Sequence, residues 1–441
     1  MYRKIILIAL IIFSIIPNIL LCQDYSQQLD SLIRKYIKLD MFSGVVLLAK
    51  DGNPVYKKAF GYSDWKNKTE NNTETLFNIC SINKVFTHSI ILQLEKEGKL
   101  KLSDPLNKYL SIYTDNIGEK ITIKMLIDMQ AGLGDYLNDP EYNSSPGKYT
   151  SVSEYLELIK KEPLLFEPGT DRRYSNSGYV VLGGIIEKVT GKSYTDNLKE
   201  RFFIPLGMNN TFYKQINDEL SNSAVGTRII YNGNKLTQIF ETSPSPAGGL
   251  RTNVDDLLKF DNELRRTKIM GGFNAWAGGT PAWNAILGQI DEHYTLIILS
   301  NLRLVAEEVF KRFELIMNNR PYPEPDLLPD IKFYKILKEE GIAGLEKGFK
   351  TILANNHLEY NDIHLNMFGY NLMENSELDL ALEIFELNAK LFPDISNVFD
   401  SLGDAYVEKG DKDKARENYK KAIALQPGNL HSKQMLDKLQ E

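Results

Sequence analysis

The chain has few of the residues from which disulfides, metal sites and histidine-based catalysis are built. Its 441 residues include only two cysteines and five histidines. We expect Cys22 to leave with an N-terminal segment, so Cys80 remains alone and no disulfide can form within the mature chain. With so few histidines, neither a metal site nor another cofactor is expected. A histidine triad is not expected either, because His88 lies two helical turns, or about 10 Å, beyond the candidate nucleophile Ser81.

An excess of positive charge is also absent. The 52 lysines and arginines are outnumbered by 58 aspartates and glutamates, which gives a formal net charge of -6. Such a surface does not favour nucleic acid, so we expect no nucleic-acid partner. The 43% hydrophobic and 25% charged content is typical of a soluble globular protein. The length predicts two domains or more.

Residues 1–22 combine a basic start with an apolar run and are interpreted as a secretory signal. Cleavage is expected near Gln23, and the mature protein is therefore expected to be exported, to the periplasm or outside the cell. A membrane anchor is the alternative. Lipid attachment through Cys22 is less favoured, because the preceding Leu21 is bulkier than a lipoprotein signal usually allows.

The candidate nucleophile and its base stand three residues apart, Ser81 and Lys84, where a short strand gives way to a helix. Residues i and i+3 share one face of a helix, so the hydroxyl and the amine can meet. The helix is apolar nearly all round, which predicts burial, and burial lowers the pKa of a lysine until it can act as a base. The same spacing recurs at Ser63 and Ser145, but neither serine opens a buried helix.

A second pair of polar residues, Tyr174 and Asn176, lies just before a helix that ends at Gly191. We expect a phenol beside a lysine ammonium to have a lowered pKa and to relay protons, and an asparagine amide to orient a substrate carbonyl. The same pattern at 136–138 has no following helix and is interpreted as a decoy. It lies within a polar stretch, 131–150, which is expected to be an exposed loop walling a site.

Other segments carry ordinary structural signals. A helix is predicted over 27–39, a hairpin around Asp51-Gly52, and two or three strands between 273 and 301. Thr252 and Asp255 resemble a capping box for a helix that runs to about Arg266.

The last part of the chain repeats itself. Four prolines in 320–330 predict a stiff linker. Beyond it, small and aromatic residues recur with a period of 34, which is the pattern of the tetratricopeptide repeat. The matching pairs are Gly369 and Gly403, Leu372 and Tyr406, Ala381 and Ala415, Phe385 and Tyr419, and Pro393 and Pro427.

Between Tyr25 and Ile316 the ordered motifs resemble the penicillin-recognising serine hydrolases, and more narrowly their class C β-lactamase, D,D-peptidase and esterase branch. The stretches that carry the resemblance are FNICSINKVFT, FEPGTDRRYSNSGYVVLGGIIEKVTG, PLGMNNT and AGGLRTNVDDLLKF. The resemblance implies an α+β fold, in which an antiparallel sheet with flanking helices meets an all-helical lobe, here followed by an α-helical repeat domain. The expected divisions are a signal peptide (1–22), a β-lactamase-like serine hydrolase domain (23–319), a proline-rich linker (320–330) and a tetratricopeptide-repeat domain (331–441).

The resemblance also implies roles for individual residues. Ser81 attacks a carbonyl, Lys84 and Tyr174 share the proton transfers, and Asn176 positions the substrate. The backbone N–H groups of Ser81 and Gly279 hold the oxyanion. The strand that receives the substrate carries Trp276, Ala277, Gly278 and Gly279.

Two departures from the branch shape the functional hypotheses. Trp276 stands where the branch has lysine or histidine, and the segment before it is short. The first hypothesis is an exported serine hydrolase that forms an acyl-enzyme on an ester or amide, with an esterase-like preference because Trp276 offers no charge to a substrate carboxylate. The alternative is a catalytically inactive protein that binds cell wall or peptide.

Under either hypothesis the repeats are expected to hold a protein or peptide partner, and the alternative is that they only pack on the hydrolase domain. Cutting the chain near Pro325 is expected to leave activity toward a small ester unchanged.

Overall fold

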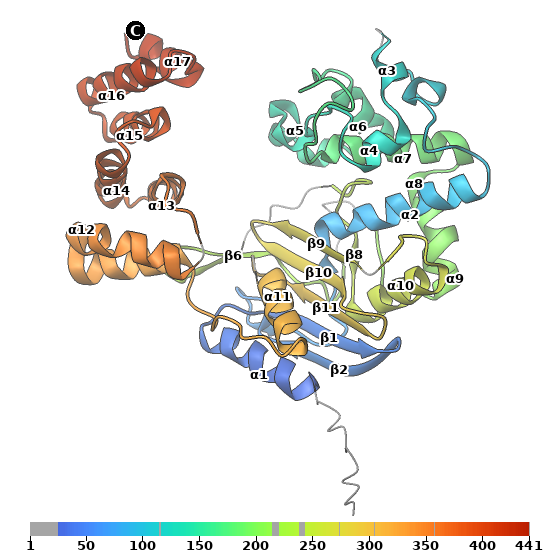
Figure 1. The fold of residues 1–441 in the computed structure, drawn as a ribbon. Helices are drawn as coiled ribbons and strands as arrows, with labels where there is room; N and C mark the ends of the chain where they lie inside the picture. The colour runs from blue at the N-terminus through green and yellow to red at the C-terminus, as the bar shows by residue number, and fades with distance from the viewer. Residues whose placement is uncertain are drawn as a thin grey trace, which may run out of the picture.

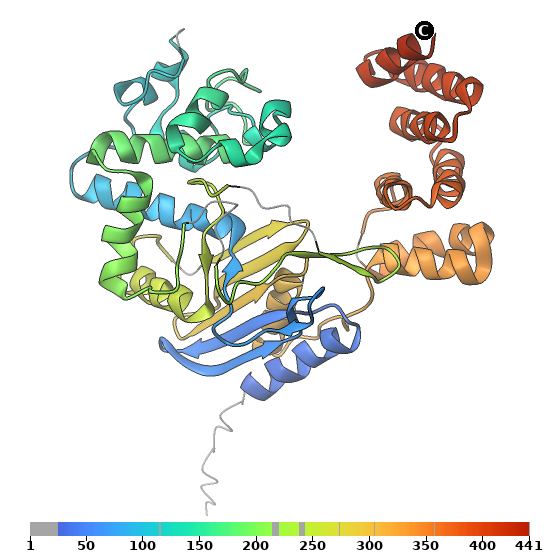
Figure 2. The same ribbon diagram turned by 180° about the vertical axis from the view of Figure 1, so that it is seen from behind.

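The computed structural model describes residues 25–440, apart from 114–115, 214–219, 238–242, 273, 304 and 357. The predicted signal and Cys22 lie outside the described residues. The described chain forms a sheet with its helices, a helical lobe that is inserted between the second and third of the sheet's strands in sequence, and a C-terminal array of helices (Figures 1 and 2). No helix among the described residues is long and apolar enough to cross a membrane.

The sheet has five antiparallel strands in the order β2-β1-β11-β10-β9. They are β1 (Gly44–Lys50), β2 (Asn53–Phe60), β9 (Ala275–Thr280), β10 (Trp283–Gln289) and β11 (Tyr294–Ser300). The N-terminal hairpin is thereby joined to the last three strands, with Leu47 of β1 opposite Ile297 of β11. Because successive side chains point to opposite faces, β1, β10 and β11 each supply apolar residues to two cores.

One core lies between the sheet and the two terminal helices, α1 (Tyr25–Lys38) and α11 (Ala306–Met317). The other lies between the sheet and the helical lobe, where α2 (Asn83–Lys96) and α10 (Val254–Thr267) contribute buried residues. Asn253 caps α10 by accepting a hydrogen bond from the Asp256 backbone, so the capping box predicted at Thr252 and Asp255 is wrong by one residue. Threonine and asparagine are both favoured caps, and only the local backbone decides which position is used.

The helical lobe contains α7, a central buried helix, surrounded by shorter ones. Its helices are α3 (Ile117–Lys120), α4 (Ile123–Ile127), α5 (Pro140–Ser144), α6 (Val152–Ile159), α7 (Asn176–Thr190), α8 (Tyr194–Leu198) and α9 (Ile204–Leu206). The expectation of an exposed loop over 131–150 is only partly correct: many of its residues are exposed, but the segment contains α5, and Tyr136, Tyr142 and Tyr149 are buried and pack on Tyr155 of α6. Their aromatic area outweighs the polar residues between them.

Three pairs of short strands complete the first part of the chain. They are β3 (Tyr62–Asp64) with β4 (Thr69–Glu70), β5 (Phe77–Asn78) with β8 (Arg251–Thr252), and β6 (Thr227–Ile229) with β7 (Lys235–Thr237).

The C-terminal array begins with α12 (Pro329–Asn355), which is broken at Gly341, and so its first helix starts inside the predicted linker. It continues with α13 (Ile363–Glu374), α14 (Leu378–Leu391), α15 (Ser396–Lys409), α16 (Lys412–Leu425) and α17 (Leu430–Gln440). A Cβ on Gly369 would lie 2.7 Å from the Phe385 ring, and one on Gly403 would lie 2.6 Å from the Tyr419 ring. The 34-residue period therefore reflects one repeated contact, a glycine that makes room for an aromatic side chain.

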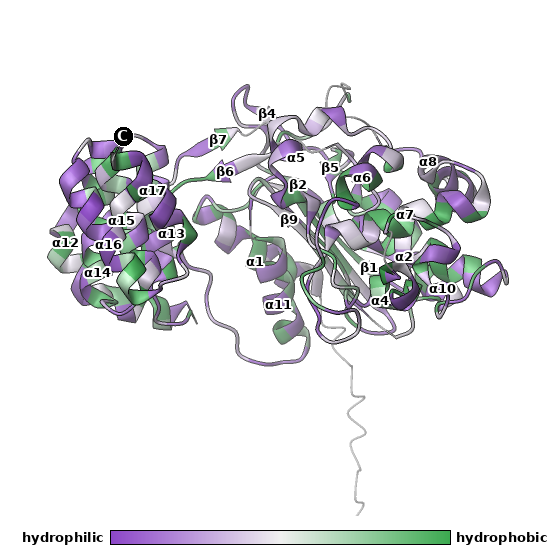
Figure 3. Ribbon diagram, turned by 90° about the horizontal axis from the view of Figure 1, so that it is seen from above, coloured by the Kyte–Doolittle hydropathy of each residue, from purple (hydrophilic) through white to green (hydrophobic). Residues whose placement is uncertain are grey.

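The β6–β7 hairpin runs from the first part of the chain to the array, as Figure 3 shows. Its base is held by the Thr227 N–H, which donates to the carbonyls of Ala282 and Asn301. Its tip, Ile230 and Tyr231, is buried in the core of the array with Phe333 and Phe368. The core of the C-terminal array therefore includes residues from the middle of the chain.

Candidate active site

Ser81 lies in a short 3-10 turn, Cys80–Ile82, that leads directly into α2. The turn follows β5, whose pairing with β8 fixes its start. Cys80 has a φ of 48°, a left-handed conformation that is unusual for a residue with a side chain, and the Asn78 side chain accepts its N–H at 2.8 Å. Burial raises the pKa of the Cys80 thiol to about 12, so this cysteine is not a competing nucleophile.

Lys84 is buried one turn further along, with 6% of its surface exposed. Its Nζ lies 2.6 Å from Asn176 Oδ1, 2.7 Å from the Ala247 carbonyl oxygen and 3.1 Å from Ser81 Oγ. Desolvation lowers the pKa of Lys84 to about 7, although Asp135 acts in the opposite direction. A neutral amine has two N–H groups and one lone pair; the two carbonyl oxygens can take the N–H groups, which leaves the lone pair for the Ser81 hydroxyl.

Tyr174 completes the contact with the serine, since its OH lies 2.6 Å from Ser81 Oγ. The side chain is half exposed, and Lys84 Nζ lies 4.9 Å from the centre of its ring. Partial burial raises the pKa of Tyr174, and so the expected lowering of this pKa is wrong. The lysine that was expected to lower it is itself driven toward its neutral form by burial. A phenol with a raised pKa keeps its proton at neutral pH, so Tyr174 contacts Ser81 as a neutral hydroxyl.

Asn176 is oriented by a residue that the sequence did not single out. Its Nδ2 donates to Asp135 Oδ2 at 2.7 Å, which turns its Oδ1 toward Lys84. Asp135 lies 41 residues earlier, and no local pattern connects the two. The only signal was its position beside Tyr136, in the segment interpreted as a decoy.

These residues open onto a cavity of about 320 Å³. Its lining comes from the turn before α2, the loops at 136–137 and 247–249, the start of α7, strand β9 and the start of α11. The lining residues are Asn78, Cys80, Ser81, Tyr136, Leu137, Tyr174, Asn176, Ala247, Gly248, Gly249, Ala277, Gly278, Gly279, Thr280 and Glu307. Tyr136 and Leu137 therefore line the site, although Tyr174 and Asn176, not this segment, contact Ser81 and Lys84.

Strand β9 forms one wall of the cavity. A Cβ on Gly278 would lie 2.3 Å from the Ile79 carbonyl oxygen and 2.8 Å from the Ser81 backbone nitrogen, so only glycine allows this close approach. Ala277 and Gly279 also line the cavity. Trp276 does not, because its side chain packs against the core between the sheet and the lobe. The expected contact of its indole with substrate is therefore not found, and the oxyanion role of the Ser81 and Gly279 N–H groups stays a prediction.

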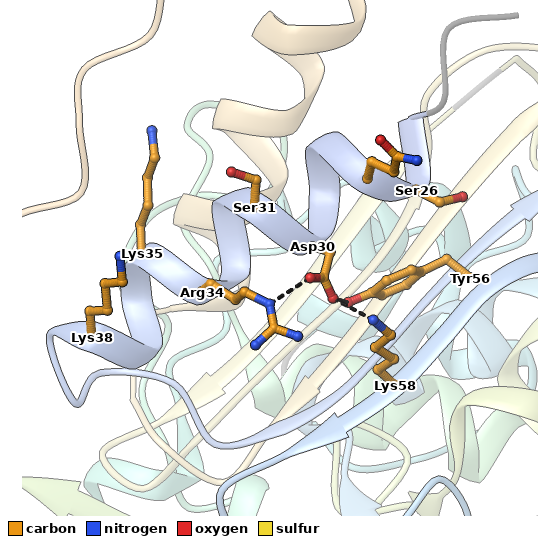
Figure 4. A pocket seen from close by; sticks show the side chains of 9 residues that line it. Ser26, Asp30, Ser31, Arg34, Lys35, Lys38, Tyr56 and Lys58 are labelled. Carbon is orange, nitrogen blue, oxygen red and sulfur yellow. Dashed lines mark hydrogen bonds and ion pairs between the residues drawn. The ribbon is translucent and has the colours of Figure 1, made fainter.

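A larger hollow, of about 480 Å³, lies beside α1. Its centre is Asp30, which accepts hydrogen bonds from Arg34, Tyr56 and Lys58 (Figure 4). Desolvation raises the pKa of Asp30, but these donors outweigh it and lower the pKa to about 2. The hollow contains no paired nucleophile and base, and Asp30, Arg34, Lys35 and Lys58 already form ion pairs.

One group of side chains with metal-ligand chemistry occurs among the described residues. It consists of Asp400, Asp404 and His431 in the C-terminal array, away from the cavity. Tyr370 and Tyr419 donate hydrogen bonds to Asp404, and His431 pairs with Asp400. The cysteine and histidine counts gave no indication of this cluster, and its contacts are explained as links between neighbouring helices.

The antiparallel sheet with its terminal helices, the helical lobe and the serine at their junction define the β-lactamase/transpeptidase-like fold. Comparison with known families agrees: residues 29–289 match the Beta-lactamase family, and residues 397–429 match the Tetratricopeptide repeat. The chain belongs to the Beta-lactamase family, and the resemblance found in its sequence is confirmed.

Individual relatives cover most of the first part of the chain. The chain is 27% identical to Penicillin-binding protein 4* of Bacillus subtilis (strain 168), over 70% of this chain and 80% of that protein. It is 29% identical to Protein flp of Staphylococcus aureus (strain MRSA252), over 54% of this chain but only 48% of that protein.

Solved structures show the same fold. A penicillin binding protein from Bacillus halodurans superposes with a TM-score of 0.58 and 21% identity, over 65% of this chain and 98% of that chain. A class C beta lactamase gives a TM-score of 0.56 and 17% identity, over 67% of this chain and 98% of that chain.

Proposed function

We propose that this protein is an exported serine hydrolase that acts on esters or amides through an acyl-enzyme. The observation that carries the proposal is the environment of Lys84, whose two carbonyl partners leave its lone pair to Ser81. A base with a pKa near 7 is well suited to activate a hydroxyl at neutral pH.

In the proposed acylation, Ser81 Oγ forms a bond to the substrate carbonyl carbon while its proton passes to Lys84 Nζ. The bond to the leaving group then breaks, and the leaving oxygen or nitrogen takes the Tyr174 proton. The proton held by Lys84 restores the phenol. A water molecule next attacks the ester carbon with the same groups in reversed order, which releases the acid and regenerates the Ser81 hydroxyl.

The proposed preference for esters without a carboxylate rests on the charge of the cavity rather than on Trp276. No lysine or arginine occurs among the described residues that line the cavity, and Glu307 adds a negative charge. A substrate carboxylate finds no charge-assisted partner there, which usually costs one to two decades of affinity. Short-chain nitrophenyl esters are expected to be turned over well, and penicillins and cephalosporins poorly.

The rest of the chain supports two further parts of the proposal. The apolar run in residues 1–22 supports export. The repeat array supports binding of a protein or peptide partner, because stacked helix pairs present an extended surface.

Labelling with a fluorophosphonate distinguishes a hydrolase from an inactive binding protein. The wild-type protein should gain the mass of one phosphonyl group, and Ser81→Ala should gain none. Ser63→Ala and Ser145→Ala should label like the wild type, since Ser63 donates its hydroxyl to the carbonyl of Thr69 and Ser145 does not line the cavity. An unlabelled wild-type protein would support the inactive alternative, and labelling of Ser81→Ala would contradict the mechanism.

A further inference from the structure

Glu307 is the only residue with a formally charged side chain among the described residues that line the cavity. It is the second residue of α11, a helix that otherwise packs on the far face of the sheet. Its carboxylate thus reaches the cavity from an element that takes no part in the Ser81, Lys84 and Tyr174 cluster.

Asn284 holds Glu307 in this position. Asn284 is 1% exposed, and its Oδ1 accepts the backbone N–H groups of Ala306 and Glu307 at 2.7 and 3.3 Å. Its Nδ2 lies 3.2 Å from Glu307 Oε1 and 3.3 Å from the Gly278 carbonyl oxygen. One buried amide therefore joins the start of α11 to the strand that lines the cavity.

The Glu307 carboxylate has no ion-pair partner within the described part of the chain. Its side chain accepts one hydrogen bond, from Asn284 Nδ2 to Oε1, and no described residue hydrogen-bonds to Oε2. An unpaired carboxylate in a partly enclosed site attracts cations and repels anions more strongly than one in bulk water. Its neighbour Glu308, by contrast, pairs with Arg312 of the same helix.

We propose that Glu307 selects acyl donors that carry a protonated amine, and this inference rests on the proposed function. The ammonium group of the acyl part would donate to Glu307 Oε2 while its ester carbonyl meets Ser81. Acylation forms the Oγ–carbon bond and breaks the bond to the leaving alcohol, which takes the Tyr174 proton while the Ser81 proton passes to Lys84 and then restores the phenol; the ammonium keeps its charge throughout. The site then distinguishes three otherwise similar esters by charge alone.

The test uses three nitrophenyl esters of similar length, whose acyl parts are 6-aminohexanoate, heptanoate and hydrogen adipate, and each rate is corrected for nitrophenol release without enzyme. For the full wild-type chain, kcat/KM for the amine ester should exceed that for heptanoate by about tenfold or more, and the adipate should be the poorest substrate. Glu307→Gln keeps an oxygen for Asn284 and removes the charge, so the amine ester should fall to the level of heptanoate. Glu308→Gln should retain the wild-type order.

The outcomes separate this inference from the function on which it rests. Turnover of all three esters without a charge preference, or a preference that survives in Glu307→Gln, would overturn the role of Glu307 alone. A wild-type protein that turns over none of the esters and resists the fluorophosphonate would overturn both. Thermal unfolding of each variant establishes that the comparison is made between folded proteins.

Discussion

Burial and the charge of Asp135 have opposite effects on the pKa of Lys84. Burial favours the neutral amine, whereas the negative charge of Asp135 favours the ammonium form. Asp135 nevertheless holds Asn176 in the orientation in which its amide oxygen faces Lys84. The residue that makes the base slightly less available is therefore the residue that positions it.

The pH dependence of acylation should report this balance. Only the neutral amine can accept the Ser81 proton, so kcat/KM for a nitrophenyl ester should rise as the pH passes through about 7, the lowered pKa of Lys84. Replacing Asp135 by Asn removes a charge that raises this pKa. The rising limb of the profile should therefore move to lower pH, while the plateau falls because Asn176 is less firmly held.

Asp135→Glu is the matched control, since it keeps the charge and should leave the limb near its wild-type position. A profile for Asp135→Asn whose limb stays at the wild-type pH would show that Asp135 has no electrostatic effect on the base.

Among the site residues, the sequence predicted the pairs that are close in the chain and missed the residues that reach the site only through distant contacts. Ser81 and Lys84 are three residues apart, and Tyr174 and Asn176 are two apart, so each pair was visible as a pattern. Asp135 and Glu307 reach the site only through the folded chain. The direction of the Tyr174 pKa was missed because burial cannot be read from a motif.

Strand β9 and the turn before α2 touch through their backbones, and Gly278 makes this possible. Gly278→Ala would place a methyl group against backbone atoms of Ile79 and Ser81, which cannot move aside as a flexible side chain could. Such overpacking typically costs about 1 to 3 kcal/mol of unfolding free energy. We expect a lower melting temperature and a loss of ester turnover larger than the loss of folded protein explains.

Gly272→Ala provides the comparison for this element. It lies just before β9, and a Cβ there meets nothing within 4 Å. It should change neither the melting temperature nor the turnover measurably. If Gly278→Ala behaves in the same way, the close contact of β9 with the serine turn is not required for catalysis.

The sequence placed β9 correctly but not the orientation of its side chains. The glycine run at 278–279 identified the strand. Because successive side chains of a strand point to opposite faces, Trp276 and Gly278 share one face, and Ala277 and Gly279 share the other. On the face shared with Gly278, the larger Trp276 meets the core. An aromatic side chain gains more from that burial than from the rim of a cavity.

The part of the chain up to α11 and the C-terminal array are joined by the linker between α11 and α12 and also by the β6–β7 hairpin. Tyr231 donates a hydrogen bond to Glu377, stacks obliquely on Tyr334 at 4.8 Å, and is 2% exposed. Arg228 forms an ion pair with Glu374. Neither this hairpin nor the helices that cover its tip were predicted from the sequence, because the contact joins distant parts of the chain.

Because the tip of the β6–β7 hairpin is buried in the array, we expect removal of the array to expose apolar surface. A chain that ends at Pro325 exposes Ile230 and Tyr231, and we expect it to self-associate in size-exclusion chromatography. The same chain with Ile230→Ser and Tyr231→Ser should be monomeric and should turn over a small ester at the full-length rate. The opposite result, a monomeric truncated chain without these substitutions, would show that the hairpin does not depend on the array.

The order of synthesis also matters for the hairpin tip. Ile230 and Tyr231 are synthesised well before Phe333 and Phe368, the side chains that cover them. Until those helices are made, the aromatic tip of the nascent chain is uncovered. Strand β1 also remains unpaired on one side until β11 is made. Chains with such late-arriving partners expose apolar surface for longer and depend more on protection from aggregation. Slowing translation between residues 240 and 330 should therefore lengthen the period in which a newborn chain is bound by a chaperone.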